Sequence, residues 1–481
     1  MNSDRKRVLI VGGGVTGLTL AYRLQEKFRR IKKSADIILI ESTDRLGGTI
    51  ETENRDGFIL EKGPDSFFNS KSNVLSLCED LQIQDRIIGT SSNHRRSFVL
   101  QSDKLTPIPK GFYLMSPIGI LPFLASPLVS VFGKIRMMCD LVLPRKSTHK
   151  DESLYDFVVR RFGHEALQKI AQPMIGGIFS ADPKELSLKA TMPQFVELEQ
   201  KYRSVILGLR KTMLSKDNNS GGSSNISGAR YGLFVSFDKG MAVLTDSLKD
   251  NLQFVDLRLK NELTSVERTT VGWDIGINGN EVFQVDSICF AAINPKISKL
   301  IQTISPKFSN FFSELDFSSL ATINFVFNRE EILHPLNGMG FVVPDIEGRQ
   351  ILACSFSSIK FPNRALEGHA LLRVFVREKQ SNKFLKENSV SVIESVLKEL
   401  RMILKIEGEP QSIDISFYDK STPKYKVGHL ERLESLEETL SEFPGLFFAG
   451  KGYRGVGIAD CVASADLATE KICNFLDSYS I

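Results

Sequence analysis

The sequence predicts an α/β fold, and three observations near its start predict it. Residues 7–11 form an apolar run suited to a buried parallel strand, and the pattern GGGVTG follows directly at residues 12–17. Apolar residues then recur at helical spacing over 18–24, and a second apolar run over 37–40 ends at Glu41. A strand, a GxGxxG turn, a helix, a strand and an acid in this order indicate a Rossmann-like dinucleotide-binding unit.

Each spaced glycine of the turn has a physical reason. Gly12 allows the tight turn, Gly14 lets the backbone approach a pyrophosphate, and Gly17 lets the helix pack on the strand. The helix presents N–H groups and the positive end of its dipole to a phosphate. Glu41 can accept hydrogen bonds from ribose hydroxyls. We therefore expect a bound dinucleotide, and a tight turn without a ligand is the weaker interpretation.

The composition describes a globular chain of several domains. The 481 residues are 42% hydrophobic and 25% charged, which excludes a disordered chain, a collagen and a coiled rod as descriptions of the whole. The net charge is +4, from 61 Lys+Arg against 57 Asp+Glu. Since nucleic-acid-binding proteins usually carry a clustered basic stripe, we expect no nucleic acid as a partner.

The cysteines and histidines form no recognisable metal or redox motif. None of the six cysteines belongs to a CxxC pair, so we expect buried free thiols in a reducing compartment. The six histidines occur singly, without ligand spacing, and we expect no metal. Residues 1–7 lead into the first strand without an apolar signal-peptide stretch, and we expect a cytoplasmic protein.

One uncharged stretch, residues 111–133, allows three interpretations. It is long enough to cross a bilayer as a helix, which needs about 20 apolar residues. Pro117, Pro122 and Pro127 recur in it, and each removes a helix hydrogen bond that a bilayer would not replace. We therefore expect short helices packed in a subdomain. Contact with a membrane surface is the second interpretation, and a spanning helix is the least supported.

The segment after Glu41 favours a flavin dinucleotide over a nicotinamide one. Its string Arg45-Leu46-Gly47-Gly48 resembles the turn that continues the pyrophosphate cradle in the large flavoprotein group of amine oxidases and carotenoid desaturases. An arginine there offers a fixed fork of donors to phosphate, and the glycines let the chain pass close to the cofactor. The string Gly63-Pro64-Asp65-Ser66 resembles the stretch beside the isoalloxazine ring in that group. Taken alone, it is a strand ending in a turn.

The C-terminal segment resembles the second FAD signature of the same group. Residues 446–450 suit a buried strand, and Gly455-Val456-Gly457-Ile458 and an amphipathic run follow. A helix starting there would point the positive end of its dipole at the pyrimidine side of the flavin. No second strand–GxGxxG–helix unit occurs in the sequence. We infer that electrons enter from an organic substrate and leave to oxygen, a quinone or another acceptor.

The FAD-binding domain is expected to be split in three along the chain. Between its parts we expect a mostly helical domain for membrane or substrate binding, and an α+β substrate-binding domain with an antiparallel sheet. The expected bounds are 1–90, 225–298 and 415–481 for the FAD-binding domain, 91–214 for the helical domain and 299–414 for the substrate-binding domain.

Three further segments have local patterns of their own. The acidic start and apolar spacing of residues 151–162 predict a helix. Residues 319–328 and 351–376 alternate or run apolar like antiparallel strands. The Gly/Ser/Asn-rich residues 215–229 predict a flexible loop.

Several strings together resemble one family, the oxygen-dependent porphyrinogen oxidases of haem synthesis (the protoporphyrinogen oxidase type), over nearly the whole chain. The resemblance implies one non-covalent FAD per chain and molecular oxygen as the electron acceptor. It also implies six-electron oxidation of a porphyrinogen in three flavin cycles, with release of hydrogen peroxide. The strings are GPDSF at 63–67, LTPIPKG at 105–111, residues 173–188, FPNRA at 361–365, residues 423–429 and residues 455–461.

Carried over by position, the resemblance assigns residues to the cofactor and the substrate. Phe361 matches an aromatic residue that stacks on a porphyrinogen ring, and a core phenylalanine in a strand-end turn is the alternative. Tyr418 lies where bacterial relatives place a flavin-side tryptophan. The residues implied in FAD binding are Gly12, Gly13, Gly14, Val15, Thr16, Gly17, Glu41, Ser42, Arg45, Gly47, Gly48, Thr49, Gly63, Pro64, Asp65, Ser66, Leu263, Tyr418, Val456, Gly457 and Ile458.

One departure from the family pattern bears on the substrate. Members from organelles carry an arginine before Phe-Val-Leu that pairs with a substrate propionate, and Ser97 stands at that position here. Gram-positive bacterial members also lack it, resemble this chain around Lys71, and tend to prefer coproporphyrinogen III, which has four propionates. We therefore expect Lys71, with Arg95 or Arg96 in reserve, to bind substrate carboxylates. Solvated surface side chains are the alternative.

The resemblance implies a chemistry that needs little from side chains. A meso C–H of the substrate donates hydride to flavin N5 while a pyrrole N–H is lost, and the protein places that carbon and shields the cofactor. No catalytic side chain is assigned. Protoporphyrinogen IX is the alternative substrate. Another flavin amine oxidase or desaturase, or a porphyrin-binding flavoprotein without turnover, is a more distant alternative.

The expected partners follow from the same resemblance. They are the porphyrinogen, molecular oxygen and the next enzyme of the haem pathway, ferrochelatase. Peripheral contact with the inner face of a membrane is also expected. Monomer and homodimer both stay open.

Overall fold

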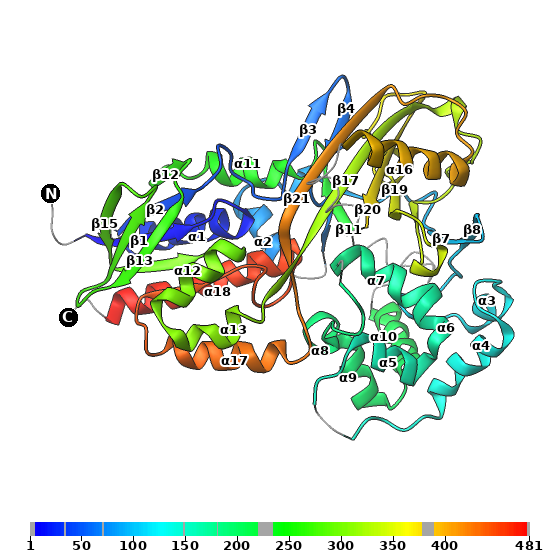
Figure 1. The fold of residues 1–481 in the computed structure, drawn as a ribbon, viewed down its shortest axis with the longest axis horizontal. Helices are drawn as coiled ribbons and strands as arrows, with labels where there is room; N and C mark the ends of the chain where they lie inside the picture. The colour runs from blue at the N-terminus through cyan, green and yellow to red at the C-terminus, as the bar shows by residue number, and fades with distance from the viewer. Residues whose placement is uncertain are drawn as a thin grey trace.

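The computed structural model describes residues 5–32, 35–69, 72–147, 150–179, 181–219, 234–377 and 389–478. Figure 1 shows three parts: an α/β part that holds both ends of the chain, a second part built on a large sheet, and a bundle of helices below that sheet. The α/β part and the sheet part meet along the long strands β17 (Asp316–Asn328) and β21 (Ser412–Lys424).

The α/β part is built on a parallel sheet whose strand order is β12-β2-β1-β16-β22. Its middle strand β1 is buried on both faces, as the apolar run over 7–11 predicts: Val8 and Ile10 contribute to one core, Leu9 and Val11 to the other. The strand bounds are β1 Lys6–Val11, β2 Ala35–Glu41, β12 Val255–Leu259, β16 Ser287–Phe290 and β22 Leu446–Phe448.

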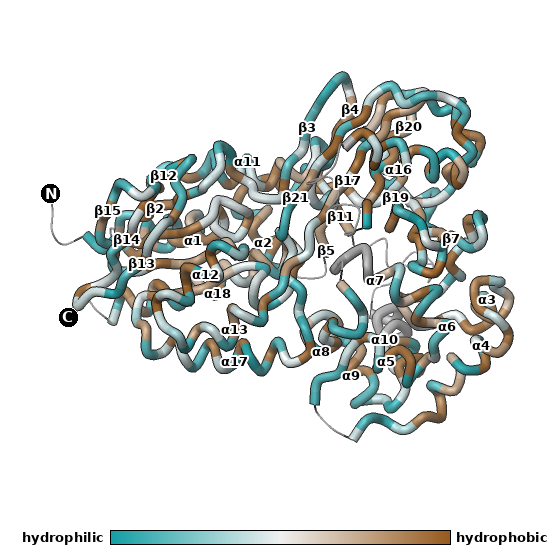
Figure 2. Tube along the Cα trace, viewed as in Figure 1, coloured by the Kyte–Doolittle hydropathy of each residue, from teal (hydrophilic) through white to brown (hydrophobic). Residues whose placement is uncertain are grey.

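Helices cover one face of this sheet, and a small sheet with helices covers the other. The first layer holds α1 (Val15–Ile31), α2 (Ser72–Asp80), α11 (Ala242–Asp250) and α18 (Ile458–Ser478). The second holds β13 (Leu263–Arg268), β14 (Trp273–Ile277), β15 (Glu281–Val285), α12 (Pro295–Ile304), α13 (Ser309–Phe312) and α17 (His429–Leu440). Figure 2 shows hydrophobic residues gathered inside this part and hydrophilic residues along its outer edges.

The second part is a seven-stranded sheet of order β21-β17-β20-β19-β18-β7-β8. The strands predicted at 319–328 and 351–376 are present and antiparallel, as β17, β19 and β20. Helix α16 (Ser389–Leu404) packs on it. The remaining bounds are β18 Gly340–Val342, β19 Ile351–Phe356, α14 Ser357–Lys360, β20 His369–Val376, β7 Phe98–Gln101 and β8 Lys104–Pro107.

The large sheet extends beyond the residue range 299–414 that was expected for the substrate-binding domain, at two places. Strands β7 and β8 lie inside the range 91–214, which was expected to be helical. They join the large sheet instead, because Phe98 and Leu100 bury their side chains in its core. Strand β21 runs past residue 414, because it pairs with β17 from Ser412 to Lys424. Strands β7 and β8 therefore belong to the large sheet, which β21 extends to Lys424.

Two small sheets connect the parts. One is the hairpin β3 (Thr52–Arg55) and β4 (Phe58–Glu61). The other has the order β5-β11-β6, with bounds Phe67–Phe68, Phe234–Phe237 and Ile87–Gly89.

The third part is helical from residue 120 onward. The helix predicted over 151–162 is α5, and Ser153 caps it by accepting from the Asp156 N–H. The helices are α3 Ile120–Ala125, α4 Val131–Met138, α5 Leu154–Phe162, α6 His164–Ala166, the π-helix Leu167–Ala171, α7 Gln172–Phe179, α8 Leu188–Thr191, α9 Pro193–Tyr202 and α10 Val205–Asn219.

The uncharged stretch 111–133 breaks into short elements, as its prolines predict. It forms β9 (Phe112–Tyr113), β10 (Ser116–Pro117), α3 and the start of α4. In the ranges described above, none of the helices combines the length and apolarity that crossing a bilayer requires. Helix α10 continues to Asn219, into the predicted flexible loop, and residues 220–229 lie outside the described residues.

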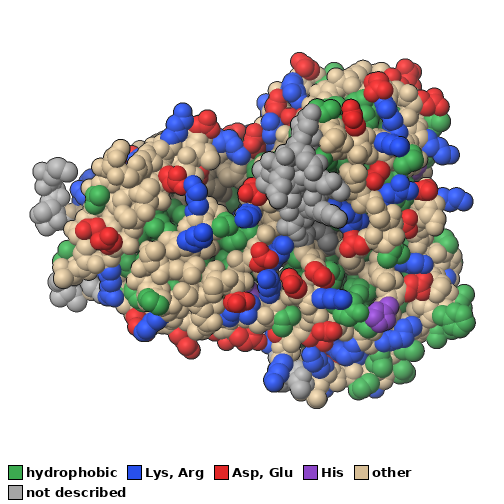
Figure 3. All heavy atoms as spheres, in the orientation of Figure 1, with side chains coloured by type: hydrophobic (Ala, Val, Ile, Leu, Met, Phe, Trp, Pro, Cys, Tyr) green, Lys and Arg blue, Asp and Glu red, His purple; other side chains and the backbone are tan. Residues whose placement is uncertain are grey.

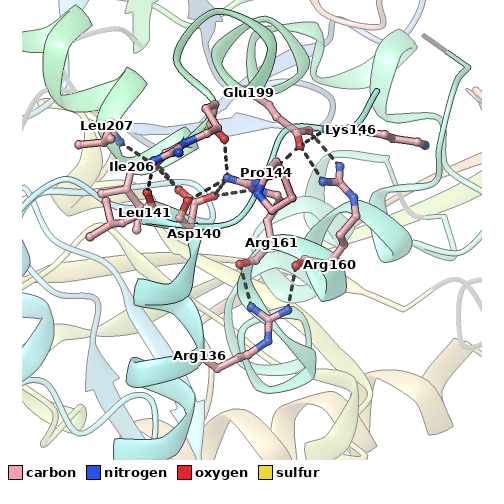
Figure 4. Close-up of polar contacts among 12 residues, drawn as sticks. Arg136, Asp140, Leu141, Pro144, Lys146, Arg160, Arg161, Glu199, Ile206 and Leu207 are labelled. Carbon is pink, nitrogen blue, oxygen red and sulfur yellow. Dashed lines mark hydrogen bonds and ion pairs between the residues drawn. The ribbon is translucent and has the colours of Figure 1, made fainter. Parts of the chain in front are cut away.

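A buried ion-pair network holds the helical part together (Figure 4). Arg161 and Asp140 are fully buried, and Arg161 donates to Asp140 through Nε at 2.6 Å. Asp140 also accepts from Ser204 Oγ at 2.5 Å. Arg160 donates to both oxygens of Glu199, at 2.6 and 2.9 Å. Because each buried charge has a partner, the network joins α5, α9 and the turn before residue 142 without an uncompensated charge.

Candidate functional site

The glycine turn between β1 and α1 has the geometry that the sequence predicts. Gly12 has a φ of +108°, a value that favours glycine. A Cβ on Gly17 would lie 1.9 Å from the Gly12 carbonyl oxygen, so only glycine lets α1 start so close to β1. The Cβ position of Gly14 has 3.8 Å to its nearest neighbour, Gly48 Cα. Val15 and Thr16 form the first turn of α1, whose free N–H groups are the phosphate donors of this fold.

The loop at residues 45–49 lies directly beside this turn. The Gly47 N–H donates to the Gly13 carbonyl at 2.8 Å, and Gly47 and Gly48 both have positive φ, at +106° and +60°. Arg45 donates to the Gly48 carbonyl at 2.6 Å and pairs with Glu51 at 2.8 Å. The arginine expected to bind phosphate therefore stabilises the turn of its own loop in this structure.

Glu41 at the end of β2 organises the same edge. Its Oε2 accepts from the Gly13 N–H at 2.8 Å, and its Oε1 accepts from the N–H and hydroxyl of Thr43, each at 2.9 Å. The exposed hydroxyl of Ser42 also donates to Oε1, at 3.3 Å. The Asn261 N–H donates to the Glu41 carbonyl at 2.9 Å, which brings the start of β13, with the buried Leu263, to this edge.

The segment 63–66 continues the cradle after β4. A Cβ on Gly63 would lie 1.5 Å from the Thr49 carbonyl oxygen, so this segment packs directly on the loop described above. Asp65, after Pro64, accepts from Lys360 Nζ through both carboxylate oxygens, at 2.7 and 2.8 Å, and from Ser66 Oγ at 2.8 Å. Burial would raise the pKa of Asp65, but the charges of Lys360 and Arg373 hold it well below its usual range.

The C-terminal turn between β22 and α18 closes the opposite side. Gly455 has a φ of +90°, and the Gly457 N–H donates to Asp460 Oδ2 at 3.2 Å, just before Ile458 starts α18. A Cβ on Gly455 would lie 2.3 Å from the Asp460 carboxyl carbon. The half-buried Val456 packs against the helical part, so this turn touches two of the three parts.

Two stacked aromatic rings contact the chain between β22 and the turn at 455–458. The rings of Tyr425 and His429 lie 4.1 Å apart at 15°. Tyr425 donates its hydroxyl to the Lys451 carbonyl at 2.6 Å, and His429 Nε2 lies 2.8 Å from the Tyr453 carbonyl, to which it donates. Burial lowers the pKa of His429 to about 4, so its ring is neutral near pH 7. Residues 423–429, a string of the family resemblance, therefore position the cofactor-side loop.

The residues expected to bind substrate differ in exposure: one is buried and two lie at the surface. Phe361 is only 1% exposed, and the cations of Lys360 and Arg364 lie 5.1 and 5.4 Å from its ring centroid. Arg95 and Arg96 are exposed, and Arg96 donates to the Asn337 carbonyl at 2.5 Å. Lys71 lies outside the described residues.

Three cations of this site were missed by the sequence reasoning: Lys360, Arg364 and Arg373. Arg364 stands within the string 361–365, in which only the aromatic residue was interpreted. Arg373 is a single charged residue within the buried strand β20. A charge in such a strand is rare without a partner, and that is the signal that could have found it.

The assembled cradle fits a flavin dinucleotide. It joins three segments far apart in the chain at the carboxyl ends of β1, β2 and β22, where ligands bind in such sheets. The hydroxyl of Tyr418 is buried and has no hydrogen-bond partner among the described residues, so a polar group of a ligand would satisfy it. Fold and site together define a dinucleotide-binding flavoprotein with a split cofactor domain.

Comparison with known proteins gives the family. The family described as flavin containing amine oxidoreductase matches residues 15–473, and the chain belongs to it. The coproporphyrinogen III oxidase of Bacillus subtilis (strain 168) is 30% identical, covering 99% of this chain and 100% of its own. That of Staphylococcus aureus is 27% identical, covering 97% and 99%. The predicted flavoprotein, its FAD cofactor and its oxidoreductase class are confirmed.

Solved structures agree with these matches. A protein of Exiguobacterium sp. 255-15 described as a protoporphyrinogen oxidase superposes with a TM-score of 0.84 at 29% identity, covering 99% of this chain and 100% of its own. Reduced UDP-galactopyranose mutase superposes with a TM-score of 0.70 at 16% identity, and this likeness shows the fold alone. The predicted α/β flavoprotein fold and the resemblance to porphyrinogen oxidases are confirmed.

Proposed function

We propose that this chain oxidises coproporphyrinogen III to coproporphyrin III with molecular oxygen. The observation that carries the proposal is the 30% identity to a coproporphyrinogen III oxidase over 99% of this chain and all of the relative. The reaction removes six hydrogens from the substrate and converts three oxygen molecules to three of hydrogen peroxide. FAD, when bound, supplies the acceptor for one hydride in each of three cycles.

The residues of this chain are proposed to bind the cofactor, orient the substrate and shield the flavin from water. We propose that the turns at 12–17, 45–49 and 455–458 would hold the cofactor by backbone N–H groups, with the positive dipole ends of α1 and α18 favouring negative charge. Phe361, at the junction of α14 and the following turn, is proposed as the substrate-stacking residue on the resemblance alone, and at 1% exposure its ring would have to be uncovered to stack on a porphyrinogen. Because the acceptor is a ring atom, precise placement of the substrate carbon is the main contribution of the protein.

We propose that cations which bind the propionates select the substrate. Coproporphyrinogen III has four propionates and protoporphyrinogen IX has two, so each additional cation favours the first. Arg95 and Arg96 are exposed and precede Ser97, the position at which organelle members carry their arginine. Lys71 is proposed as a third carboxylate anchor on the resemblance alone.

Anaerobic mixing with each porphyrinogen tests the reaction. Bleaching of the flavin absorbance by coproporphyrinogen III, followed in air by porphyrin fluorescence and peroxide in a ratio of one to three, is the expected result. Flavin that stays oxidised would leave only a porphyrin-binding role. A larger kcat/KM for protoporphyrinogen IX, the activity of relatives such as the 26% identical enzyme of Arabidopsis thaliana, would reverse the choice of substrate.

Variants of the proposed anchors test selection separately. Lys71→Ala and Arg95→Ala are expected to raise KM for coproporphyrinogen III several-fold, with kcat little changed, because they bind a part of the substrate that does not react. The matched control is Lys296→Ala, since Lys296 is 82% exposed and pairs with Glu262 on the surface of the α/β part. An unchanged KM in both anchor variants would remove them from the site.

We also propose that the helical part touches a membrane surface on the inner face. Large apolar side chains are exposed together on α3, α4 and the following turn, where Figure 3 shows hydrophobic atoms gathered at the lower right edge. Such patches mark interaction surfaces more often than chance exposure. The residues are Leu121, Leu124, Val131, Phe132, Ile135 and Val142, from 46% to 85% exposed.

Co-sedimentation with vesicles of phosphatidylglycerol and phosphatidylethanolamine tests the membrane contact. Phe132→Ser with Ile135→Ser should release the protein from the vesicles, whereas Val282→Ser, at 72% exposure on β15, should not. Absence of vesicle binding together with a homodimer in light scattering would assign the patch to a second copy. Absence of vesicle binding with capture of purified ferrochelatase would assign it to transfer of the product.

A further inference from the structure

Three cations from one stretch of the substrate-side sheet hold the cofactor-side segment 62–66. Lys360 binds the Asp65 carboxylate, as described above. Arg373 donates through Nη2 to the carbonyls of Lys62 and Gly63, the first at 3.2 Å. Arg364 donates to Ser236 Oγ at 2.8 Å, and Ser236 in turn donates to the Asp65 carbonyl at 2.8 Å. The segment beside the cofactor is therefore fixed by charged groups from α14 to β20.

The buried charges of this cluster do not cancel. Lys360, Arg364 and Arg373 carry three positive charges, and Glu61 and Asp65 carry at most two negative ones. Arg364 and Arg373 are each 2% exposed and Glu61 is 4% exposed. Burial raises the pKa of Glu61, which favours its neutral form. Even if Glu61 is counted as ionised, the five side chains carry an excess of one positive charge. The cluster is therefore net positive.

Arg373 is the cation of this cluster that has no carboxylate within ion-pair distance among the described residues. Lys360 forms its ion pair with Asp65 at 2.7 Å, and Arg364 lies 3.9 Å from Glu61. In the parts of the chain that the structure describes, no carboxylate lies within 4.0 Å of the Arg373 guanidinium, and its buried Nε has no hydrogen-bond partner. Burial lowers its pKa, but an arginine stays protonated at neutral pH.

An unpaired buried charge is costly, so it persists where an anion compensates it during function. Gly63 and Asp65, which Arg373 and Lys360 contact, belong to the segment that the family resemblance implies in FAD binding, and reduction of a flavin adds negative charge to its ring. We propose that Arg373 is a buried counter-charge that stabilises reduced FAD, and that carbonyl oxygens of Lys62 and Gly63 hold it in place. The inference rests on the FAD site and is independent of the substrate.

The proposal makes predictions of opposite sign for two substitutions. Arg373→Met removes the unpaired positive charge, so the preference of the protein for reduced over oxidised FAD should fall about tenfold. For a two-electron couple this is a decrease of about 30 mV in midpoint potential. Asp65→Asn removes a negative charge beside the same segment and leaves Lys360 unpaired, so the midpoint potential should rise. Arg373→Lys keeps the charge and should keep the preference within about twofold.

Reductive titration of the purified holoproteins against a reference dye measures these potentials without any porphyrinogen. The control is Lys307→Met, because Lys307 is 56% exposed and pairs with Glu442 on the surface. A potential that is equal in the wild type, Arg373→Met and Arg373→Lys proteins would overturn the proposal, even if both variants retained less FAD. If Arg373→Met does not fold, an unchanged or lowered potential in Asp65→Asn overturns it. Failure of porphyrinogen oxidation would leave these shifts unaffected.

Discussion

The substitution Gly17→Ala tests whether the nucleotide site needs the close contact between the start of α1 and the turn that follows β1. The added Cβ would lie 1.9 Å from the Gly12 carbonyl oxygen and 3.1 Å from its carbonyl carbon. Ordinary contact between such atoms needs about 3.4 Å or more, so the helix start or the turn must move by more than an ångström. Both sides are backbone, and neither can rotate away. Overpacking of this kind costs about 3 kcal/mol, the upper part of its usual range.

The displaced atoms belong to the turn whose N–H groups would bind the diphosphate, so the cost appears in FAD affinity. About 3 kcal/mol corresponds to roughly a hundredfold weaker binding. Fluorescence titration of the apoprotein with FAD measures it. Gly89→Ala is the matched control, since a Cβ there meets nothing within 4 Å and its φ is not positive. Equal FAD affinity in both variants would refute the steric argument.

The remaining predictions concern stability. Arg161→Met leaves the fully buried Asp140 without its cation and should cost about 3–5 kcal/mol in urea unfolding, whereas Arg29→Met, at 68% side-chain exposure, should change it by less than about 0.5 kcal/mol. Equal costs would refute the buried-pair interpretation. His429 has a folded pKa of about 4, below its ordinary 6.5, mainly because it is buried. The unfolded state therefore takes up the proton first as pH falls, and stability present above pH 6.5 should decrease by about 3 kcal/mol by pH 4. His429→Asn, which keeps a donor for the Tyr453 carbonyl, should flatten this dependence, and an unchanged slope would contradict it.

Local patterns were sufficient for the nucleotide unit and for the element types around it. The order of strand, glycines, helix, strand and acid over residues 7–41 is a property of neighbouring residues, and the structure reproduces it as β1, α1 and β2. The prolines of 111–133 likewise predict short helices, because each proline acts on the hydrogen bond of its own turn.

Other features depend on contacts that the local pattern does not carry. The contacts of Arg45 with the Gly48 carbonyl and the Glu51 carboxylate are an example that the sequence pattern did not indicate, and its contact with phosphate stays a prediction. The membership of β7 and β8 in the large sheet depends on pairing with β18, about 240 residues further on. A short strand can pair with any compatible edge, so its sheet is decided by packing.

The sequence by itself determined the α/β nucleotide-binding unit, because glycine turns and apolar periodicity act over a few residues. Its motifs also carry the resemblance to porphyrinogen oxidases, which implies FAD as the cofactor. Only the tertiary structure decided which charges meet. It placed Lys360 on Asp65, 295 positions away in the chain, and left Arg373 buried without a carboxylate partner in the described ranges. The physical reason is that an ion pair depends on distance in space, which the folded sheets set and the spacing in sequence does not.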